Sequence, residues 1–287
     1  MTQPLRLLSI GAHPADTFDQ NAGALAHHAS RGDYVACISM TNGTRIHDEV
    51  ISDSMFHRDQ VPDGPELLDL MSRQTGVKEQ EVKDACKILG VNDVYFMGLD
   101  DDILLVTPDA IRKLARMIRA IKPDIVMTHF PKESDGLYGQ HAVAGQIAMH
   151  AIQFAVSVDP GDRNPPHRVA QVFFFGIGAA KVRRGVWESE GGYTNDVFVN
   201  ITDVVDKKLA ALDCLVSQGY GGEYARKRIE ASDGAFGQMA NCPYAEGFIS
   251  LKSEVHYYLP VTEHELMIAS FSDHEIINHE SARHKSI

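Results

Sequence analysis

The stretch LRLLSIGAHPADTFDQNAGALAHHASRGDYVACISM, residues 5–40, decides the fold. Its first residues, 5–11, form a short apolar run followed by a turn, which is typical of a buried parallel strand. Helical spacing of apolar side chains follows over 18–31, and a second apolar run covers 34–40. A strand, a helix and a strand in succession predict the unit from which parallel sheets are built.

The same alternation continues to residue 175. It predicts an α/β fold with a Rossmann-like, doubly wound, mainly parallel sheet that carries helices on both faces. Gly90 ends one predicted helix, and Pro108 stands in the first turn of the next. Helices are predicted over 66–89, 108–121 and 139–156, and strands over 94–97, 124–128 and 169–175.

The rest of the chain is less regular and ends in a polar tail that we expect to be partly extended. We expect one catalytic domain over 1–253, followed by an extension over 254–287 that makes an oligomer contact. The pattern predicts an irregular glycine-rich stretch over 176–196, a strand over 197–201, an amphipathic helix over 203–218 and a short helix over 224–230.

Composition and charge narrow the range of partners. The chain carries 39 acidic against 27 basic residues, a formal net charge of −12, which disfavours nucleic acid and anionic membranes and leaves a small molecule as the expected substrate. The four cysteines contain no CxxC pair, which fits reduced thiols and an expected cytoplasmic location. We recognise no signal peptide, and no run approaches the roughly 18 apolar residues of a membrane helix.

Polar side chains follow the first and fourth predicted strands. In a doubly wound sheet these strands lie side by side where the strand order reverses, and ligands bind at their carboxyl ends. Two imidazoles and one carboxylate are the ligands expected of a catalytic zinc ion. We therefore predict one divalent metal ion, zinc, that activates water for attack on an electrophilic carbon. The predicted ligands are His13, Asp16 and His141, and His129, Glu133, Asp135 and Tyr138 lie near them in sequence.

Each of these residues alone also has a plainer interpretation. Asp16 could cap the helix that follows, because aspartate is a favoured N-cap residue, and a loop histidine is usually only solvated. Two loops that both carry ligand-type residues at the predicted reversal point favour the metal site. The signatures GxGxxG, GxxxxGK[ST] and GxSxG do not occur, so dinucleotide binding, P-loop chemistry and a serine hydrolase lack their motifs.

Several segments resemble the PIG-L/LmbE zinc deacetylases in collinear order, from about residue 5 to 250. The resemblance implies that His13 and Asp16 match two metal ligands of the family's first loop and that His141 matches the third. It also implies a homo-oligomer. The matching segments are GAHPADTFDQNAGALAHH, TNGTR, KEQEVKDACKILGV, FMGLDDD, HFPKESDGLYGQHAVAGQ, VNITDVVDKKLAALDCLVSQ and YAEGF.

The chain departs from the family pattern at positions that matter for catalysis. The aspartate that the family uses as general base is Ala15 here, and the first histidine of its H-P-D-H motif is Tyr138. The acidic residue beside the last histidine is Gln140. Hydrolysis of an amide needs a base for the water and an acid for the leaving amine, so other residues must act.

We predict Asp19 or Glu133 as the base. Candidate substitutes for the missing acid and base also include His129, Asp135 and His47. On this basis the first hypothesis is hydrolysis of an N-acyl, or N-acetyl, amide of a small polar molecule.

A second hypothesis fits the departures. The 4-oxalomesaconate hydratases of the same superfamily resemble the chain in having alanine at the base position, and hydration of a double bond expels no amine. A dicarboxylate substrate would need cationic partners, for which Arg45, Lys78 and Lys132 are the candidates. A third hypothesis is a catalytically silent protein that binds a metal or a sugar.

Overall fold

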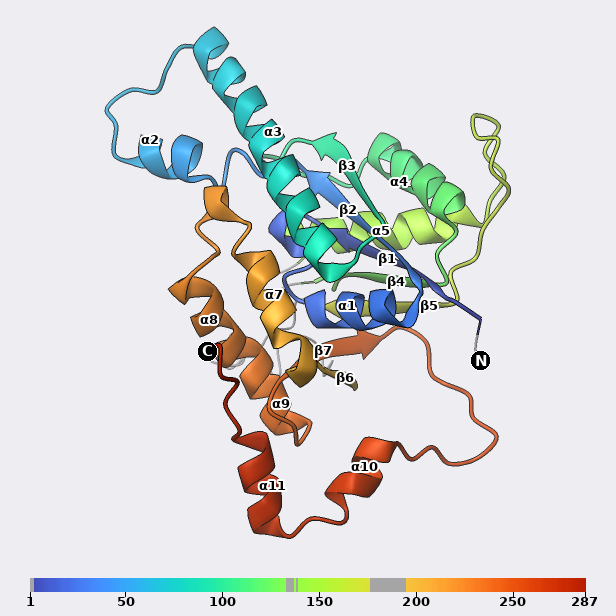
Figure 1. Ribbon diagram of the computed structural model, residues 1–287. Helices are drawn as coiled ribbons and strands as arrows, with labels where there is room; N and C mark the ends of the chain where they lie inside the picture. Colours follow the sequence, from blue (N-terminus) through green and yellow to red (C-terminus); the bar gives the residue numbers. More distant parts are fainter. Residues whose placement is uncertain (1–2, 133–136, 138, 176–194) are drawn as a thin grey trace.

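A computed structural model of the protein describes residues 3–132, 137, 139–175 and 195–287 (Figure 1). Its centre is a seven-stranded sheet in the order β3-β2-β1-β4-β5-β7-β6. Strands β3 to β5 in this order run parallel, and β7 runs antiparallel to both β5 and β6. The predicted doubly wound, mainly parallel sheet is confirmed. The strands are β1 Arg6–Gly11, β2 Tyr34–Thr41, β3 Asp93–Leu99, β4 Ile125–His129, β5 Gln171–Phe175, β6 Val197–Asn200 and β7 Ala245–Ser250.

Helices cover both faces of this sheet (Figure 1). Leu7 and Val35 point into a core shared with α1, α3 and α7, whereas their neighbours Leu8 and Ala36 point into a core shared with α4 and α5. Successive strand residues face opposite sides, so each central strand is apolar on both. The helices are α1 Ala22–Arg31, α2 Ser54–Phe56, α3 Gly64–Leu89, α4 Pro108–Ile121, α5 Gln140–Ala155, α7 Val205–Leu212, α8 Glu223–Ile229, α9 Ala235–Met239, α10 Glu263–Ile268 and α11 Asp273–Glu280.

The strand order reverses between β1 and β4. The chain passes from β1 outward to β2 and β3 and then returns to place β4 on the other side of β1. This is the arrangement that the sequence predicts, and it brings the loops after β1 and β4 to one edge of the sheet.

Two predicted helices have different bounds in the structure. The helix predicted over 18–31 begins only at Ala22, where Glu246 of β7 accepts hydrogen bonds from the N–H groups of Gly23 and Ala24 over 2.9 Å. The helix predicted over 203–218 is continuous only as α7, and 3₁₀ turns flank it. Ser217 in the second of these turns bonds instead to Glu81 of α3, which satisfies its backbone N–H outside a helix.

The tail contains more structure than the sequence analysis expects. Helices α10 and α11 each begin with a capping box, Thr262 with Glu265 and Ser272 with Glu275. This motif satisfies two backbone groups of the first turn and is visible in sequence as S/T-x-x-E. The expectation of a partly extended tail therefore holds only for the residues before α10.

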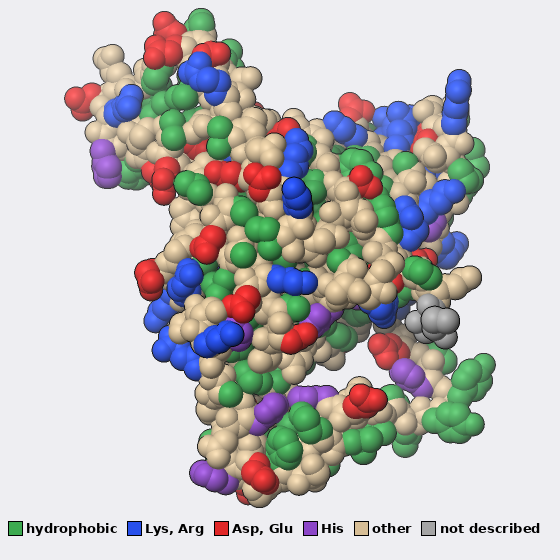
Figure 2. Space-filling view, in the orientation of Figure 1, with side chains coloured by type: hydrophobic (Ala, Val, Ile, Leu, Met, Phe, Trp, Pro, Cys, Tyr) green, Lys and Arg blue, Asp and Glu red, His purple; other side chains and the backbone are tan. Residues whose placement is uncertain are grey.

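A segment without helix or strand, residues 253–262, separates β7 from α10; we name it the C-terminal arm. Tyr257 and Leu259 are almost fully exposed, at 101% and 97%. Figure 2 shows hydrophobic side chains on the arm, with open space between the arm and the body. Beyond the arm the chain returns to the body, where His264 Nε2 donates to the carbonyl of Ala240 and the N–H of His284 donates to the hydroxyl of Tyr244.

Candidate metal centre

The loop after β1 is folded tightly against the end of its own strand. A Cβ atom on Gly11 would lie 2.5 Å from the backbone nitrogen of Thr17, so only glycine fits there. Thr17 is held in turn, because its carbonyl accepts from the hydroxyl of Ser9 over 2.7 Å. Within the loop the N–H of His13 donates to Asp16 Oδ2 over 2.8 Å. His13 and Asp16 are therefore buried and fixed in position.

The third predicted ligand comes from the first turn of α5. This helix packs closely on the end of β4, since a Cβ atom on Gly145 would lie 2.5 Å from the carbonyl oxygen of His129. The close approach carries His141 over the carboxyl ends of β1 and β4. The rings of His141 and His129 stack there, 4.6 Å apart and inclined by 14°.

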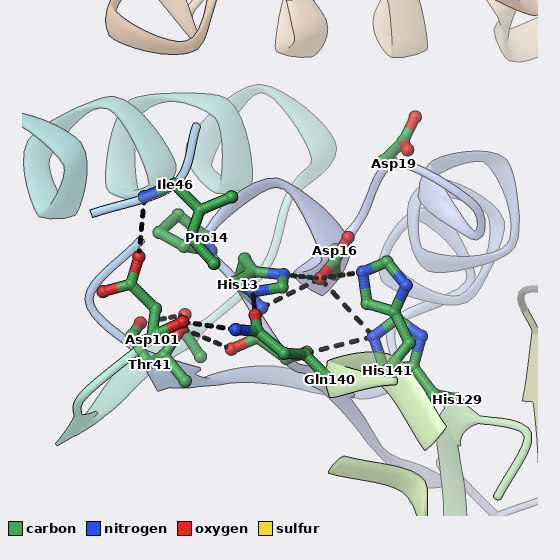
Figure 3. Close-up of polar contacts among 12 residues, drawn as sticks. His13, Pro14, Asp16, Asp19, Thr41, Ile46, Asp101, His129, Gln140 and His141 are labelled. Atoms are coloured by element: carbon green, nitrogen blue, oxygen red, sulfur yellow. Dashed lines mark hydrogen bonds and ion pairs between the residues drawn. The ribbon is translucent and has the colours of Figure 1, made fainter. Parts of the chain in front are cut away.

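One carboxylate oxygen lies at the middle of this group (Figure 3). Asp16 Oδ2 is 2.9 Å from His13 Nδ1 and 3.3 Å from His141 Nε2. The ligand-type atoms of these three residues all lie within 4.8 Å of one another, close enough to hold one metal ion. The structure thus brings together the three residues that the sequence analysis proposes as ligands.

The electrostatics of the centre favour an ionised carboxylate. Burial by itself raises the pKa of Asp16, but the charge of His141 and hydrogen bonds from the surrounding imidazoles hold that pKa well below its ordinary value. Burial lowers the pKa of His13, yet the hydrogen bond and charge of Asp16 raise it further than burial lowers it. A buried negative oxygen among imidazole nitrogens is a donor set suited to a divalent cation.

His129 lies at the back of the centre. Its Nε2 accepts the N–H of Ala12 over 3.1 Å and is 3.6 Å from Asp16 Oδ2, too far for a hydrogen bond. Burial lowers the pKa of His129, and because Nε2 accepts a hydrogen bond, the proton of the ring lies on Nδ1. The placement gives His129 a packing role under His141.

Of the two predicted bases, Asp19 and Glu133, the structure describes only Asp19. Asp19 is buried and accepts hydrogen bonds from both Nε and Nη2 of Arg228, and Figure 3 shows its carboxylate turned away from His13 and Asp16. A carboxylate held by a guanidinium in this way is poorly placed to take a proton from water. Glu133 lies outside the described residues, as do Asp135 and Tyr138.

His47 is the titratable neighbour of the centre that the sequence analysis names only among the substitutes. Its exposed ring meets the ring of His13 edge to face, with centroids 5.7 Å apart. Partial burial and the positive charge of His13 and His141 lower the pKa of His47. The loop TNGTRIHDE that carries it gave no family match in its second half, so the sequence offered no signal beyond the residue type.

The predicted substrate-binding residues occupy three different environments. Lys78 is fully buried, donates to the carbonyl of His47 over 2.7 Å and pairs with Asp48 at 3.4 Å, so it holds the loop after β2 and does not face a substrate. Arg45 is partly exposed and pairs with Asp100 at 2.9 Å. Lys132 is partly buried in the loop after β4.

A second buried cluster of charges lies next to Asp19, and we name it the lysine cluster. Lys208 Nζ lies 2.9 Å from both Asp233 Oδ2 and Glu246 Oε1. A cavity of about 20 Å³, the size of one water molecule, is lined by Lys208 and Asp233 together with Asp19 and Arg228. The sequence analysis missed this cluster, because its members come from distant segments with no shared motif. The lysine cluster consists of Asp19, Lys208, Arg228, Asp233 and Glu246.

Among the helices that the structure describes, none combines the length and apolar character needed to cross a bilayer.

Known proteins resemble the chain in both sequence and fold. Residues 8–152, half of the chain, match the family model described as PIG-L: GlcNAc-PI de-N-acetylase. A 1D-myo-inositol 2-acetamido-2-deoxy-alpha-D-glucopyranoside deacetylase of Geodermatophilus obscurus is 25% identical over 81% of this chain and 82% of its own. A 4-oxalmesaconate hydratase of Pseudomonas putida is 25% identical over 85% of this chain and 88% of its own.

Two solved structures share the fold at lower identity. The 4-carboxy-2-hydroxymuconate hydratase GalB of Pseudomonas putida superposes with a TM-score of 0.68 at 23% identity, over 89% of this chain and all of that chain. The N,N'-diacetylchitobiose deacetylase of Pyrococcus horikoshii gives a TM-score of 0.66 at 18% identity, over 87% of this chain and 84% of that one. The family match and the two relatives found by sequence identify the protein as an enzyme that belongs to the PIG-L family.

Proposed function

We propose that the protein uses a divalent metal ion, zinc, to hydrolyse an N-acyl amide, most simply an N-acetyl amide, of a small polar molecule. The observation that carries the proposal is the group of His13, Asp16 and His141, whose ligand atoms lie within 4.8 Å of one another. The family match and the deacetylase among the relatives support an amide as the substrate.

The donor set fits the proposed ion. Two imidazoles and one ionised carboxylate are the ligands of many catalytic zinc sites, which leave a coordination position open. When bound, zinc lowers the pKa of water to about 7 and polarises a carbonyl oxygen. The chain's own part is to hold Asp16 ionised and the two imidazoles on either side of it.

Proton transfer needs a further residue, because Ala15 offers no carboxylate. His47 stands beside the centre, and partial burial lowers its pKa, which favours the neutral ring that can accept a proton. The same ring, once protonated, can donate to the leaving amine. We therefore propose His47 as the acid and base, with Glu133 as the other candidate.

A second candidate function is hydration of a small unsaturated oxo-dicarboxylate such as 4-oxalomesaconate. The specific observation in its favour is Ala15 at the family's base position, together with a hydratase relative matched over 88% of its length. No amine leaves in this reaction, so it requires one acid fewer. Arg45 and Lys132 are the proposed partners for the carboxylates.

A proton NMR time course of the zinc-loaded protein separates the two reactions. The panel holds N-acetylated amino sugars, N-acetylated amino acids and unsaturated oxo-dicarboxylates. Growth of an acetate methyl signal supports the hydrolase, and loss of a vinyl signal without acetate supports the hydratase. No turnover of any compound by zinc-loaded protein would contradict both and favour a silent binding protein.

We also propose that residues 254–287 are an extension to a domain over 1–253 and that they join copies of the chain into a homo-oligomer. The exposed C-terminal arm supports this, since large apolar side chains in water favour association. Light scattering after gel filtration tests it: the full chain should exceed its monomer mass of 31.6 kDa. The double variant Tyr258→Ser, Leu259→Ser should shift toward the monomer; an unchanged mass would contradict the arm's role.

A further inference from the structure

We propose that Gln140 is a positioning residue that fixes the tautomer of His13 and thereby selects Nδ1 of that ring as its metal-binding atom. The inference rests on the proposed metal centre and assigns a role to a residue that departs from the family pattern. It follows from which groups the Gln140 amide can bond.

The side chain of Gln140 bridges two loops (Figure 3). Its Oε1 contacts Nε2 of His13, and its Nε2 contacts the main-chain carbonyl oxygen of Asp101. The three groups come from the loop after β1, the loop after β3 and the first residue of α5. The amide thus connects the metal ligand to a part of the chain that lies outside the centre.

Donor and acceptor chemistry decides the orientation of this bridge. A carbonyl oxygen only accepts, so the amide must turn its NH₂ group toward Asp101 and its oxygen toward His13. An amide oxygen also only accepts, so Nε2 of His13 must carry a hydrogen. Nδ1, which faces Asp16, is then the nitrogen that can give up its hydrogen and offer a lone pair to a metal ion.

The other ring nitrogen of His13, Nδ1, lies beside the other two proposed ligands. His13 Nδ1 is the atom that lies 2.9 Å from Asp16 Oδ2, which His141 Nε2 approaches to 3.3 Å. The hydrogen bond of Nε2 also fixes the rotation of the ring about its own axis. A ligand whose other nitrogen is bonded in this way is typical of metal sites, where such partners set tautomer and orientation.

The far end of the bridge is rigid as well. Asp101 is 1% exposed, and its Oδ2 accepts the N–H groups of Arg45 over 2.9 Å and Ile46 over 3.2 Å. The loop after β3 is therefore tied to the loop that carries His47. Because Gln140 contacts both Asp101 and His13, the fixed position of this loop also restricts the ring of His13.

Only glutamine supplies both contacts at this reach. Glutamate keeps an acceptor for His13 but sets a second acceptor against the carbonyl of Asp101. Leucine has nearly the same shape and neither contact, and asparagine is one methylene shorter. These differences make Gln140→Leu and Gln140→Glu informative variants.

The first test uses the unaltered protein and zinc alone. Long-range proton–nitrogen NMR of ¹⁵N-histidine-labelled, zinc-loaded protein identifies which nitrogen of His13 carries a hydrogen. We expect the hydrogen on Nε2 and the metal on Nδ1. A hydrogen on Nδ1 would overturn the proposal, whatever the variants do.

The second test measures zinc affinity by competition with a chromophoric chelator. We expect Gln140→Leu to weaken zinc binding by about 10–100-fold and Gln140→Glu to weaken it less. The control is Gln146→Leu on the same helix, whose amide donates to the carbonyls of Pro131 and Leu137; it should bind zinc within about twofold of the unaltered protein. Equal affinity of Gln140→Leu and the unaltered protein would overturn the proposal.

The two proposals fail separately. If the unaltered protein binds no zinc, the metal centre itself is wrong, and the role of Gln140 falls with it. If it binds zinc and Gln140→Leu binds it equally well, only the positioning role is wrong.

Discussion

The metal centre and the lysine cluster are both buried groups of charged side chains, and they differ in what balances the charge. In the lysine cluster, Lys208 pairs with Asp233 and Glu246, and Arg228 pairs with Asp19. In the metal centre, Asp16 Oδ2 faces imidazole nitrogens, and no lysine or arginine among the described residues pairs with it. The chain completes one cluster with its own cations, whereas the proposed metal ion would complete the other.

This difference assigns the lysine cluster to the scaffold and the metal centre to the proposed site. A buried charge without a partner is costly, so a folded protein either pairs it, neutralises it or binds an ion there. The lysine cluster joins α1, α7 and β7, since Glu246 also caps α1. Each of the following predictions tests whether the two clusters are in fact distinct in this way.

The largest effect is expected from removing a ligand. His141→Ala should weaken zinc binding by at least about 100-fold, beyond what loss of a neighbouring partner costs, and should abolish turnover. Chelator competition measures the affinity, and His150→Ala, exposed on the same helix, is the control. Normal zinc binding by His141→Ala would contradict the contrast between the two clusters, because His141 would then not be a metal ligand.

Loss of the central cation of the lysine cluster should act on stability instead. Lys208→Met leaves Asp233 and Glu246 without their partner, and breaking such a buried pair costs about 3–5 kcal/mol. Urea unfolding of the zinc-free proteins measures the free energy, with Lys207→Met as the exposed control. A variant as stable as the control would show that the cluster contributes nothing to the scaffold.

The third prediction concerns which neighbour moves a proton. His47→Ala should lower turnover by about 100-fold, the usual contribution of a general acid or base, and Asp19→Asn should lower it by less than about tenfold because Arg228 already occupies that carboxylate. Steady-state kinetics on the substrate found by NMR decide. A larger loss of turnover for Asp19→Asn than for His47→Ala would show that Asp19 takes part in catalysis, as the sequence predicts.

The last prediction is a dependence of stability on pH. The lysine cluster holds three carboxyl groups against two cations, and burial raises the pKa of Asp233 to about 7, with Lys208 lowering it and Glu246 raising it. Since the folded pKa exceeds the ordinary value of 3.8, the folded state binds more protons between these values and loses stability as pH rises from about 4 to 7.

Asp233→Asn should remove this loss. Urea midpoints of both proteins across that range measure it, with exposed Asp59→Asn as the control. Parallel curves for Asp233→Asn and the unaltered protein would mean that Asp233 is ionised throughout.

Much of the sheet could be predicted from the sequence, because most strands are visible as apolar runs within one short segment. Apolar runs and helical spacing lie within single segments, and α4 has the bounds that were predicted, with Thr107 as its cap and Pro108 in its first turn. Strand β7 was missed, because its pairing with β5 and β6 depends on residues far away in the chain. The break after α7 was missed for the same reason, since the turn beyond it is held by Glu81 of α3.

The site residues also divide into those that the sequence could predict and those that only the fold reveals. His13, Asp16 and His141 could be proposed together because strand order places their loops at one edge of the sheet. The role of Asp19 could not be foreseen, since Arg228 stands 209 residues away in the chain and only the fold brings it there. His47 was within reach as a residue type, but its contact with His13 depends on how buried Lys78 holds the loop.

The C-terminal arm has a consequence for handling the protein. It presents Tyr257, Tyr258 and Leu259, all highly exposed, in a segment outside any helix or strand, and proteolytic cleavage concentrates in such segments. Chymotrypsin should therefore cut the free chain here first. The severed end would remain attached, because His264 and His284 still bond to the body, so the nick would be seen on a denaturing gel and missed by gel filtration.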